Sequence, residues 1–100
     1  MEVTINSEDG KILVKVEGRI DTTTAAAFQK DLEPLFEGDA THIDFDCSGL
    51  DYTSSQGLRV FLMLQKSIKA RGGRLVLRNM QPQVREVFDI TGFSSIIEII

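Results

Sequence analysis

The sequence is poor in cysteine and histidine, and it contains no long apolar run. Cys47 is the only cysteine, which excludes an internal disulfide and a zinc site built from several cysteines. His42 is the only histidine, and no acid or nucleophile surrounds it in a recognisable motif. The longest apolar run, residues 60–64, is far shorter than the roughly 20 residues that cross a membrane. We therefore expect no membrane insertion, no bound metal and no other cofactor.

Targeting and catalytic motifs are missing as well. The first ten residues, MEVTINSEDG, are acidic and alternate in polarity, unlike a secretion signal. The chain has no G-x-S-x-G elbow and no phosphate-binding lysine loop. No base motif stands near a serine, which argues against nucleophilic catalysis. We expect a protein of the cytoplasm that is not an enzyme.

The length and composition are those of one ordinary globular domain. The 100 residues are 42% hydrophobic and 26% charged, which suits a single core and predicts one domain over residues 1–100. The net charge of −4 is the wrong sign for a nucleic-acid-binding module. The charge is uneven, because residues 52–85 contain seven of the 11 bases and no acid. This segment predicts one local surface that favours anions.

Hydrophobic periodicity predicts strands that alternate with helices after an opening hairpin. Residues 3–16 alternate around a turn at residues 7–10, and Gly18 is expected to end the second strand. The other predicted elements are a helix over 25–36 distorted by Pro34, a strand over 42–47, a helix from Ser54 or Ser55 to Arg71, a strand over 75–77, a helix from Pro82 to Gly92, and a final strand over 96–100. The order β-β-α-β-α-β-α-β predicts an α/β fold, a mixed β-sheet with helices packed on it.

Two acids and the cysteine lie on the predicted strand 42–47. Asp44 and Asp46 are two residues apart, so they point to the same side of the strand. We expect them to lie on a solvated sheet edge or to contact neighbouring bases rather than to bind a cation. Cys47 ends an apolar alternation, and we expect it to be a small buried hydrophobe.

The long helix has two contrasting sides. At about 100° per residue, one stripe is formed by Gly57, Val60, Phe61, Leu64 and Ile68, which is wide enough to face the core. The opposite side is formed by Ser55, Arg59, Leu62 and Lys66, with Met63 and Lys69 beside it. Two apolar residues among charges are compatible with a docking surface. Taken alone, however, these two residues favour the alternative, that a neighbouring loop covers them or that single exposed apolar residues have no special role.

Two serines stand at the start of this helix. A serine there caps the helix, because its oxygen satisfies a free backbone N–H. The functional alternative for Ser55 is phosphorylation, which adds a charge of about −1.5 to −2 where the helix dipole favours an anion. Arg59 lies one turn further along and is able to pair with the phosphate.

Four short motifs resemble those of one known family. Residues 50–60 read LDYTSSQGLRV, which resembles the signature of the STAS domain (sulfate transporter and anti-sigma factor antagonist): an apolar strand, a short loop, and D-S-[ST]-G-L or S-S-A-G-L opening a long helix. Residues 18–21 (GRID), 72–75 (GGRL) and 79–82 (NMQP) are similar to the family's G-x-[IL]-D turn, G-G-x-L strand entry and N-x-x-P helix start. Together they span essentially the whole chain.

This resemblance implies an anti-sigma factor antagonist, which binds a serine-kinase anti-sigma factor and so releases a sigma factor. In the family the kinase phosphorylates the first serine of the signature and breaks the complex, and a phosphatase reverses the modification. Alignment on Gly57 implies that this serine is Ser55, and Asp21 matches the family aspartate near it. The residues expected to contact the partner are Asp21, Ser54, Gln56, Arg59, Leu62, Met63 and Lys66.

Two departures from the family pattern keep other functions open. Ser54 replaces an aspartate and Gln56 replaces a small residue, which favours a constitutive STAS scaffold or subunit, without a phosphoswitch, in a transport or sensory assembly. The acid-free segment 52–85 favours a third, weaker possibility, a domain that binds a small anion or a nucleotide.

Overall fold

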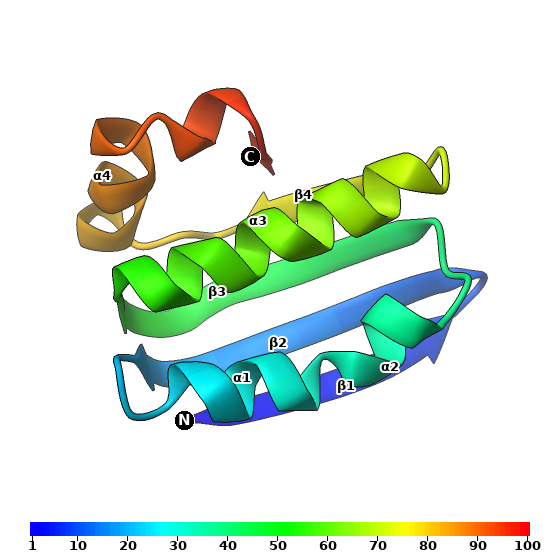
Figure 1. The fold of residues 1–100 in the computed structure, drawn as a ribbon, viewed down its shortest axis with the longest axis horizontal. Coiled ribbons are helices and arrows are strands. Elements are labelled where there is room, and N and C mark those ends of the chain that lie inside the picture. The colour runs from blue at the N-terminus through cyan, green and yellow to red at the C-terminus, as the bar shows by residue number, and fades with distance from the viewer.

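Five strands form one mixed sheet, and the helices lie on one of its faces (Figure 1). The computed structural model describes residues 1–100. Its elements are β1 (Glu2–Glu8), β2 (Lys11–Ile20), α1 (Ala25–Asp31), α2 (Glu33–Glu37), β3 (His42–Thr53), α3 (Ser55–Ala70), β4 (Arg74–Arg78), α4 (Pro82–Ile90), the 3-10 helix η1 (Phe93–Ser95) and β5 (Glu98–Ile99). The strand order is β1-β2-β3-β4-β5, with β1 antiparallel to β2 and the other neighbours parallel. The predicted α/β fold is confirmed.

A cluster of four phenylalanines holds the helices on the sheet. The ring of Phe61 in α3 lies 5.2 Å from Phe28 in α1, 5.5 Å from Phe45 in β3 and 5.6 Å from Phe88 in α4. All four rings are fully buried, and such aromatic contacts add to the free energy of burial. The five residues predicted for the core stripe of α3 are all buried as well.

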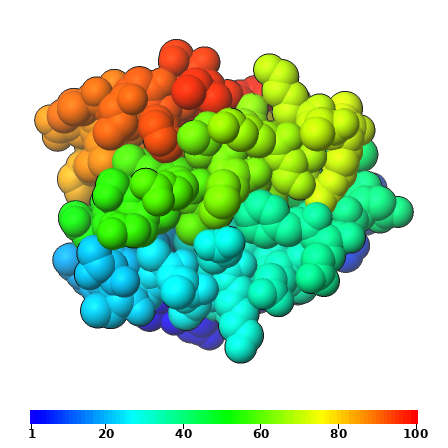
Figure 2. Space-filling view, in the orientation of Figure 1, coloured from blue at the N-terminus to red at the C-terminus, as the bar shows by residue number.

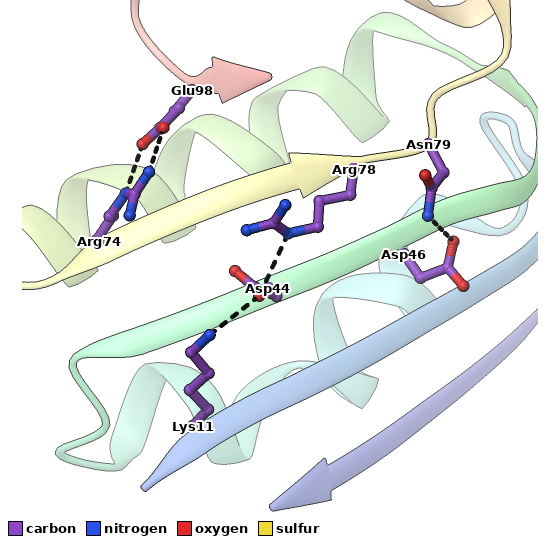
Figure 3. A network of polar contacts seen from close by, with 7 residues as sticks. All are labelled: Lys11, Asp44, Asp46, Arg74, Arg78, Asn79 and Glu98. Carbon is purple, nitrogen blue, oxygen red and sulfur yellow. Dashed lines mark hydrogen bonds and ion pairs between the residues drawn. The ribbon is translucent and has the colours of Figure 1, made fainter. Parts of the chain in front are cut away.

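The second face of the sheet carries no helix, and charged side chains cover it (Figure 3). Asp44 pairs there with Arg78 at 3.3 Å and with Lys11 at 3.8 Å, across three neighbouring strands. Arg74 of β4 pairs with Glu98 of β5. Parallel sheets are usually buried on both faces, so this row of alternating charges is what keeps the uncovered face hydrated. The expected contact with bases is confirmed for Asp44.

Asp46, on the same face, is bound mainly by neutral donors. Its carboxylate accepts hydrogen bonds from the Ser48 N–H at 3.0 Å and the Asn79 amide at 3.4 Å (Figure 3). These bonds lower its pKa, the Ser48 N–H having the largest effect. Cys47 is fully buried as expected, and burial raises the pKa of its thiol to about 12. A thiol with such a pKa is protonated and inert at neutral pH.

Two strands continue past a glycine and are longer than predicted. β2 continues past Gly18 to Ile20, and β3 continues past Gly49 to Thr53. The two extensions pair with each other, from Glu17 with Gly49 up to Ile20 with Thr53, with one shift in register just before Glu17 and a second between Gly18 and Arg19. Gly18 has φ +105 beside one of these shifts, a conformation that glycine adopts without strain. The expectation that Gly18 ends the strand is therefore wrong.

Two other predicted elements differ in smaller ways. The helix expected over 25–36 is two helices that meet at Leu32, with Pro34 in the first turn of α2, so the predicted distortion is a break. The last strand contains only Glu98 and Ile99, because η1 and the buried Ile97 precede it. No helix of the structure combines the length and the apolar character needed to cross a membrane.

Candidate functional site

The extended ends of β2 and β3 bring two distant segments of the chain together. The Ser54 N–H donates a 2.7 Å hydrogen bond to the carbonyl of Ile20. Asp21 follows Ile20 directly and Ser55 follows Ser54, so the loop before α1 starts beside the first turn of α3. The strand extensions that sequence patterning missed are what build this junction.

Ser54 caps α3. Its extended backbone (φ −84, ψ 174) places Oγ where it accepts a 3.3 Å hydrogen bond from the Gly57 N–H. Only 7% of the residue is exposed. The sequence left the cap open between Ser54 and Ser55, and the structure assigns it to Ser54. The buried Ser54 side chain is thus a structural support of the site and offers little surface to a partner.

Ser55 is the first residue of α3 and is exposed. Its hydroxyl makes one long hydrogen bond, donating to Oε1 of Gln56 at 3.4 Å. The first turn of α3 contains no acidic residue, so no side chain of that turn repels an anion held at this hydroxyl. Because Ser54 supplies the cap, modification of Ser55 removes no hydrogen bond that the helix needs.

Asp21 has a fixed carboxylate next to this turn. Its Oδ1 accepts hydrogen bonds from the backbone N–H and the hydroxyl of both Thr23 and Thr24, at 2.7 to 3.2 Å. The Thr23 hydroxyl is the main cause of a pKa below the ordinary 3.8, followed by the Thr23 N–H. Oδ2 makes no hydrogen bond within the chain. The carboxylate is therefore ionised at neutral pH and has one oxygen free.

The hydrogen bonds to Asp21 predict how the stability of the folded domain changes with pH. A depressed pKa means that the stabilisation from Asp21 is complete above pH 3.8, the ordinary value, and is lost as the pH falls through the lower value of the folded state. Thr23→Val removes the hydroxyl contact and should raise the titration midpoint of the Asp21 carboxyl toward 3.8, measured by carbon-13 NMR. Thr22→Val removes a neighbouring hydroxyl that does not bond Asp21 and should leave the midpoint unchanged. An equal midpoint in wild type and Thr23→Val would contradict this assignment.

A groove of about 250 Å³ runs between α1 and α3. In Figure 2 the α1 segment (blue to cyan) lies directly beside the α3 segment (green) on this face of the molecule. The walls are formed by Thr22, Ala25, Ala26 and Gln29 on one side and by Gln56, Arg59, Val60 and Met63 on the other. Arg59 is the only charged residue among them. Three of the residues predicted for partner contact thus line one groove.

The α1 side of this groove was missed by sequence reasoning. Thr22, Ala26 and Gln29 are small or neutral and exposed, so they carry no chemical motif. Their only sequence signal is a spacing of three and four residues, which puts them on one side of a helix. That this side faces α3 is a tertiary fact, set by the contact between Phe28 and Phe61.

Leu62 and Met63 do not form one patch. Met63 packs against the core and lines the groove. Leu62 is half-buried and belongs neither to the residues packed against the core nor to the groove lining. It points about 100° away from Met63 around the helix. The crest between them carries Ser55, Arg59 and Lys66, all exposed. The predicted docking surface therefore has an apolar side at Met63 and a second, separate apolar residue at Leu62.

Comparison with known proteins adds a family context to this geometry. The model of the STAS domain family matches residues 2–100. The anti-sigma-B factor antagonist of Bacillus subtilis is 33% identical over 99% of this chain and 90% of its own length. BtrV of Bordetella bronchiseptica, whose name places it among the anti-sigma factor antagonists, is 35% identical over 96% of this chain and 83% of its own length.

Solved structures agree on the fold. The anti-sigma factor antagonist SpoIIAA in its unphosphorylated form superposes with a TM-score of 0.82 at 21% identity, covering 99% of this chain and 88% of SpoIIAA. The phosphorylated form of SpoIIAA, from Bacillus, gives a TM-score of 0.74 at 20% identity, covering 99% and 91%. At this identity the likeness establishes the architecture alone.

Proposed function

We propose, from the premise that this chain belongs to the STAS domain family, that it binds a serine-kinase anti-sigma factor and is switched off by phosphorylation at Ser55. The curated relatives are named anti-sigma factor antagonists, a class of regulatory binding proteins. The observation that carries the proposal is an exposed serine hydroxyl at the start of α3, next to a groove lined by Arg59 and Met63. In this role the chain is a substrate of the kinase, not an enzyme, and a phosphatase restores it.

The local geometry supports a switch that acts without unfolding the domain. Ser54 provides the cap, so a phosphate on Ser55 leaves the helix start intact. The helix dipole favours the added negative charge. The phosphate changes what stands at the edge of the groove: a small neutral hydroxyl becomes a bulky dianion. A partner that packs over Ser55 then meets a steric clash and a buried charge.

Asp21 supports the same surface from the loop before α1. Its free Oδ2 lies on the segment that follows Ile20, directly beside the Ser54–Ser55 junction. A carboxylate held in place by four hydrogen bonds has little conformational entropy left to lose when a partner cation binds it. We therefore place Asp21 at the rim of the partner surface, as a contact for a basic side chain.

The test uses the purified chain and a serine-kinase anti-sigma factor from the same genome. With Mg-ATP we expect one phosphate, mapped to Ser55 by mass spectrometry, and no phosphate on the Ser55→Ala variant. In calorimetry Ser55→Ala should bind the anti-sigma factor as wild type does, whereas Ser55→Asp should bind at least about 100-fold more weakly. Ser48→Asp is the matched control, because Ser48 is an exposed serine that belongs to β3 and does not line the groove. Phosphate on another residue, or equal affinity of the two Ser55 variants, would contradict the proposal.

A second candidate is a constitutive scaffold that binds its partner without a phosphoswitch. The observation that favours it is the Gln56 side chain, whose Oε1 accepts from the Ser55 hydroxyl and stands where a kinase must approach. This candidate predicts equal partner binding by wild type and Ser55→Ala at every kinase concentration, and no modified Ser55. A Gln56→Ala variant that becomes phosphorylated when wild type does not would identify Gln56 as the obstacle.

A further inference from the structure

Arg59 differs from the other arginines of the chain, because no contact within the chain occupies its guanidinium. Arg19 also lacks an ion pair, but its guanidinium stacks on Tyr52, 4.5 Å from the ring centre. Arg74 pairs with Glu98, and Arg85 pairs with Asp89 at 3.1 Å. Arg71 donates hydrogen bonds to three backbone carbonyls and one hydroxyl. Arg59 makes no ion pair and no hydrogen bond, although it is exposed beside the groove. Its charge is therefore available to a partner or to a modification.

The surroundings of Arg59 select an anion. The groove residues next to it, among them Gln56, Gln29 and Met63, are uncharged. α3 carries three cations, Arg59, Lys66 and Lys69, and no acid at all, on a chain whose net charge is −4. A carboxylate that binds Arg59 inside the groove thus meets a positive charge and no acidic groove residue, because Asp21 lies at the rim and outside the groove lining. A basic segment lying along α3 would be repelled by the three cations of the helix.

The same arginine also lies within reach of Ser55. Residues four apart on a helix have Cβ atoms about 5–6 Å from each other, and both side chains are exposed on the crest of α3. A phosphate on Ser55 offers three acceptor oxygens, and the planar guanidinium binds two of them in parallel. The phosphate and a partner carboxylate therefore need the same donors.

We infer that Arg59 is a shared contact: it binds a carboxylate of an acidic partner segment lying in the α1–α3 groove, and phosphorylation of Ser55 captures it. The inference rests on the proposed function and deepens it. Phosphorylation then acts twice, once by adding charge and bulk at Ser55 and once by withdrawing the cation that the partner uses. The partner segment is an acidic one with an apolar side chain beside the acid, which packs against Met63 and Ala26.

The binding of Arg59 by a phosphate on Ser55 is tested without any partner. Phosphoserine is introduced at position 55 during translation, and its second pKa is measured by phosphorus-31 NMR. Pairing with Arg59 should lower this pKa from about 6 to about 5.5, and Arg59→Gln should return it to about 6. Arg85→Gln, which removes an arginine from α4, is the control and should leave the lowered pKa in place. A phosphate pKa that is the same with and without Arg59 overturns the inference.

The use of Arg59 by both the partner and the phosphate is tested with the serine-kinase anti-sigma factor of the calorimetry experiment described under Proposed function. Arg59→Gln should weaken binding of the unmodified chain about tenfold, with Arg59→Lys falling in between because it keeps the charge but not the fork. In the Arg59→Gln background, phosphorylation should reduce affinity by a smaller factor than in wild type. If phosphorylation abolishes binding while Arg59→Gln changes neither affinity nor that factor, the inference fails and the proposed function stands. If phosphorylation has no effect on binding, the proposed function fails, and the inference that rests on it fails too.

Discussion

Replacing Phe61 with alanine should lower the free energy of unfolding by about 3–5 kcal/mol. Phe61 is fully buried, and its ring contacts three other rings that come from α1, β3 and α4. Removing it leaves a cavity at the one point where three helices and the sheet meet, and these elements are too constrained to close the cavity. For a domain of this size, such a loss is a large part of the total stability.

Urea unfolding followed by circular dichroism measures this effect as a lower midpoint at an unchanged slope. Phe93→Ala is the matched control, since Phe93 is the same residue type but only half-buried in η1 and makes none of the ring contacts. It should cost clearly less than Phe61→Ala. Equal losses in the two variants would show that the four rings are not the centre of the core.

The central role of α3 is the part of the fold that periodicity predicts well. Its apolar stripe repeats with the helical period from Gly57 to Ile68, and its cap and C-terminal glycines bound it within one residue. The strand boundaries at Gly18 and Gly49 were not predictable in the same way. Glycine ends an isolated strand, but here two glycine-containing segments pair with each other across the sheet, and that pairing depends on residues about 30 positions apart.

The candidate site likewise contains residues that local sequence spacing predicts and residues that only tertiary packing brings together. Ser55, Arg59 and Met63 were predicted because they share one helix, where spacing alone fixes their relative positions. Ala26 and Gln29 were missed because they belong to α1, and only the packing of Phe28 on Phe61 brings α1 beside α3. The free state of Arg59 was also not predictable, because the sequence contains enough acids to pair it and only the structure shows that none of them lies within ion-pair distance of it.

Gly57→Val should destabilise the domain by about 3 kcal/mol and also impair partner binding. Helix propensity alone predicts no loss, because glycine is the poorer helix former of the two. Packing, in contrast, predicts a loss of stability, because a Cβ at this position lies 2.7 Å from Ile20 Cγ2 and closer still to Thr53 Oγ1. Both neighbours are buried on strands, so the first turn of α3 has to move away from the sheet.

This movement would break the hydrogen bond from the Gly57 N–H to Ser54 and displace Ser55 and Arg59 from the groove. Ala70→Val, at an exposed position near the end of the same helix, tests valine in α3 without crowding and should cost only about 0.5 kcal/mol. Thr53 Oγ1 is the nearer of the two crowding neighbours. The cost of the smaller substitution Gly57→Ala should therefore be lower in a Thr53→Ala background than in wild type. A Gly57→Val protein that is as stable as wild type would refute the close approach of α3 to the sheet. The same approach sets the position of every site residue on that helix, so loss of stability and loss of binding should appear together in this variant.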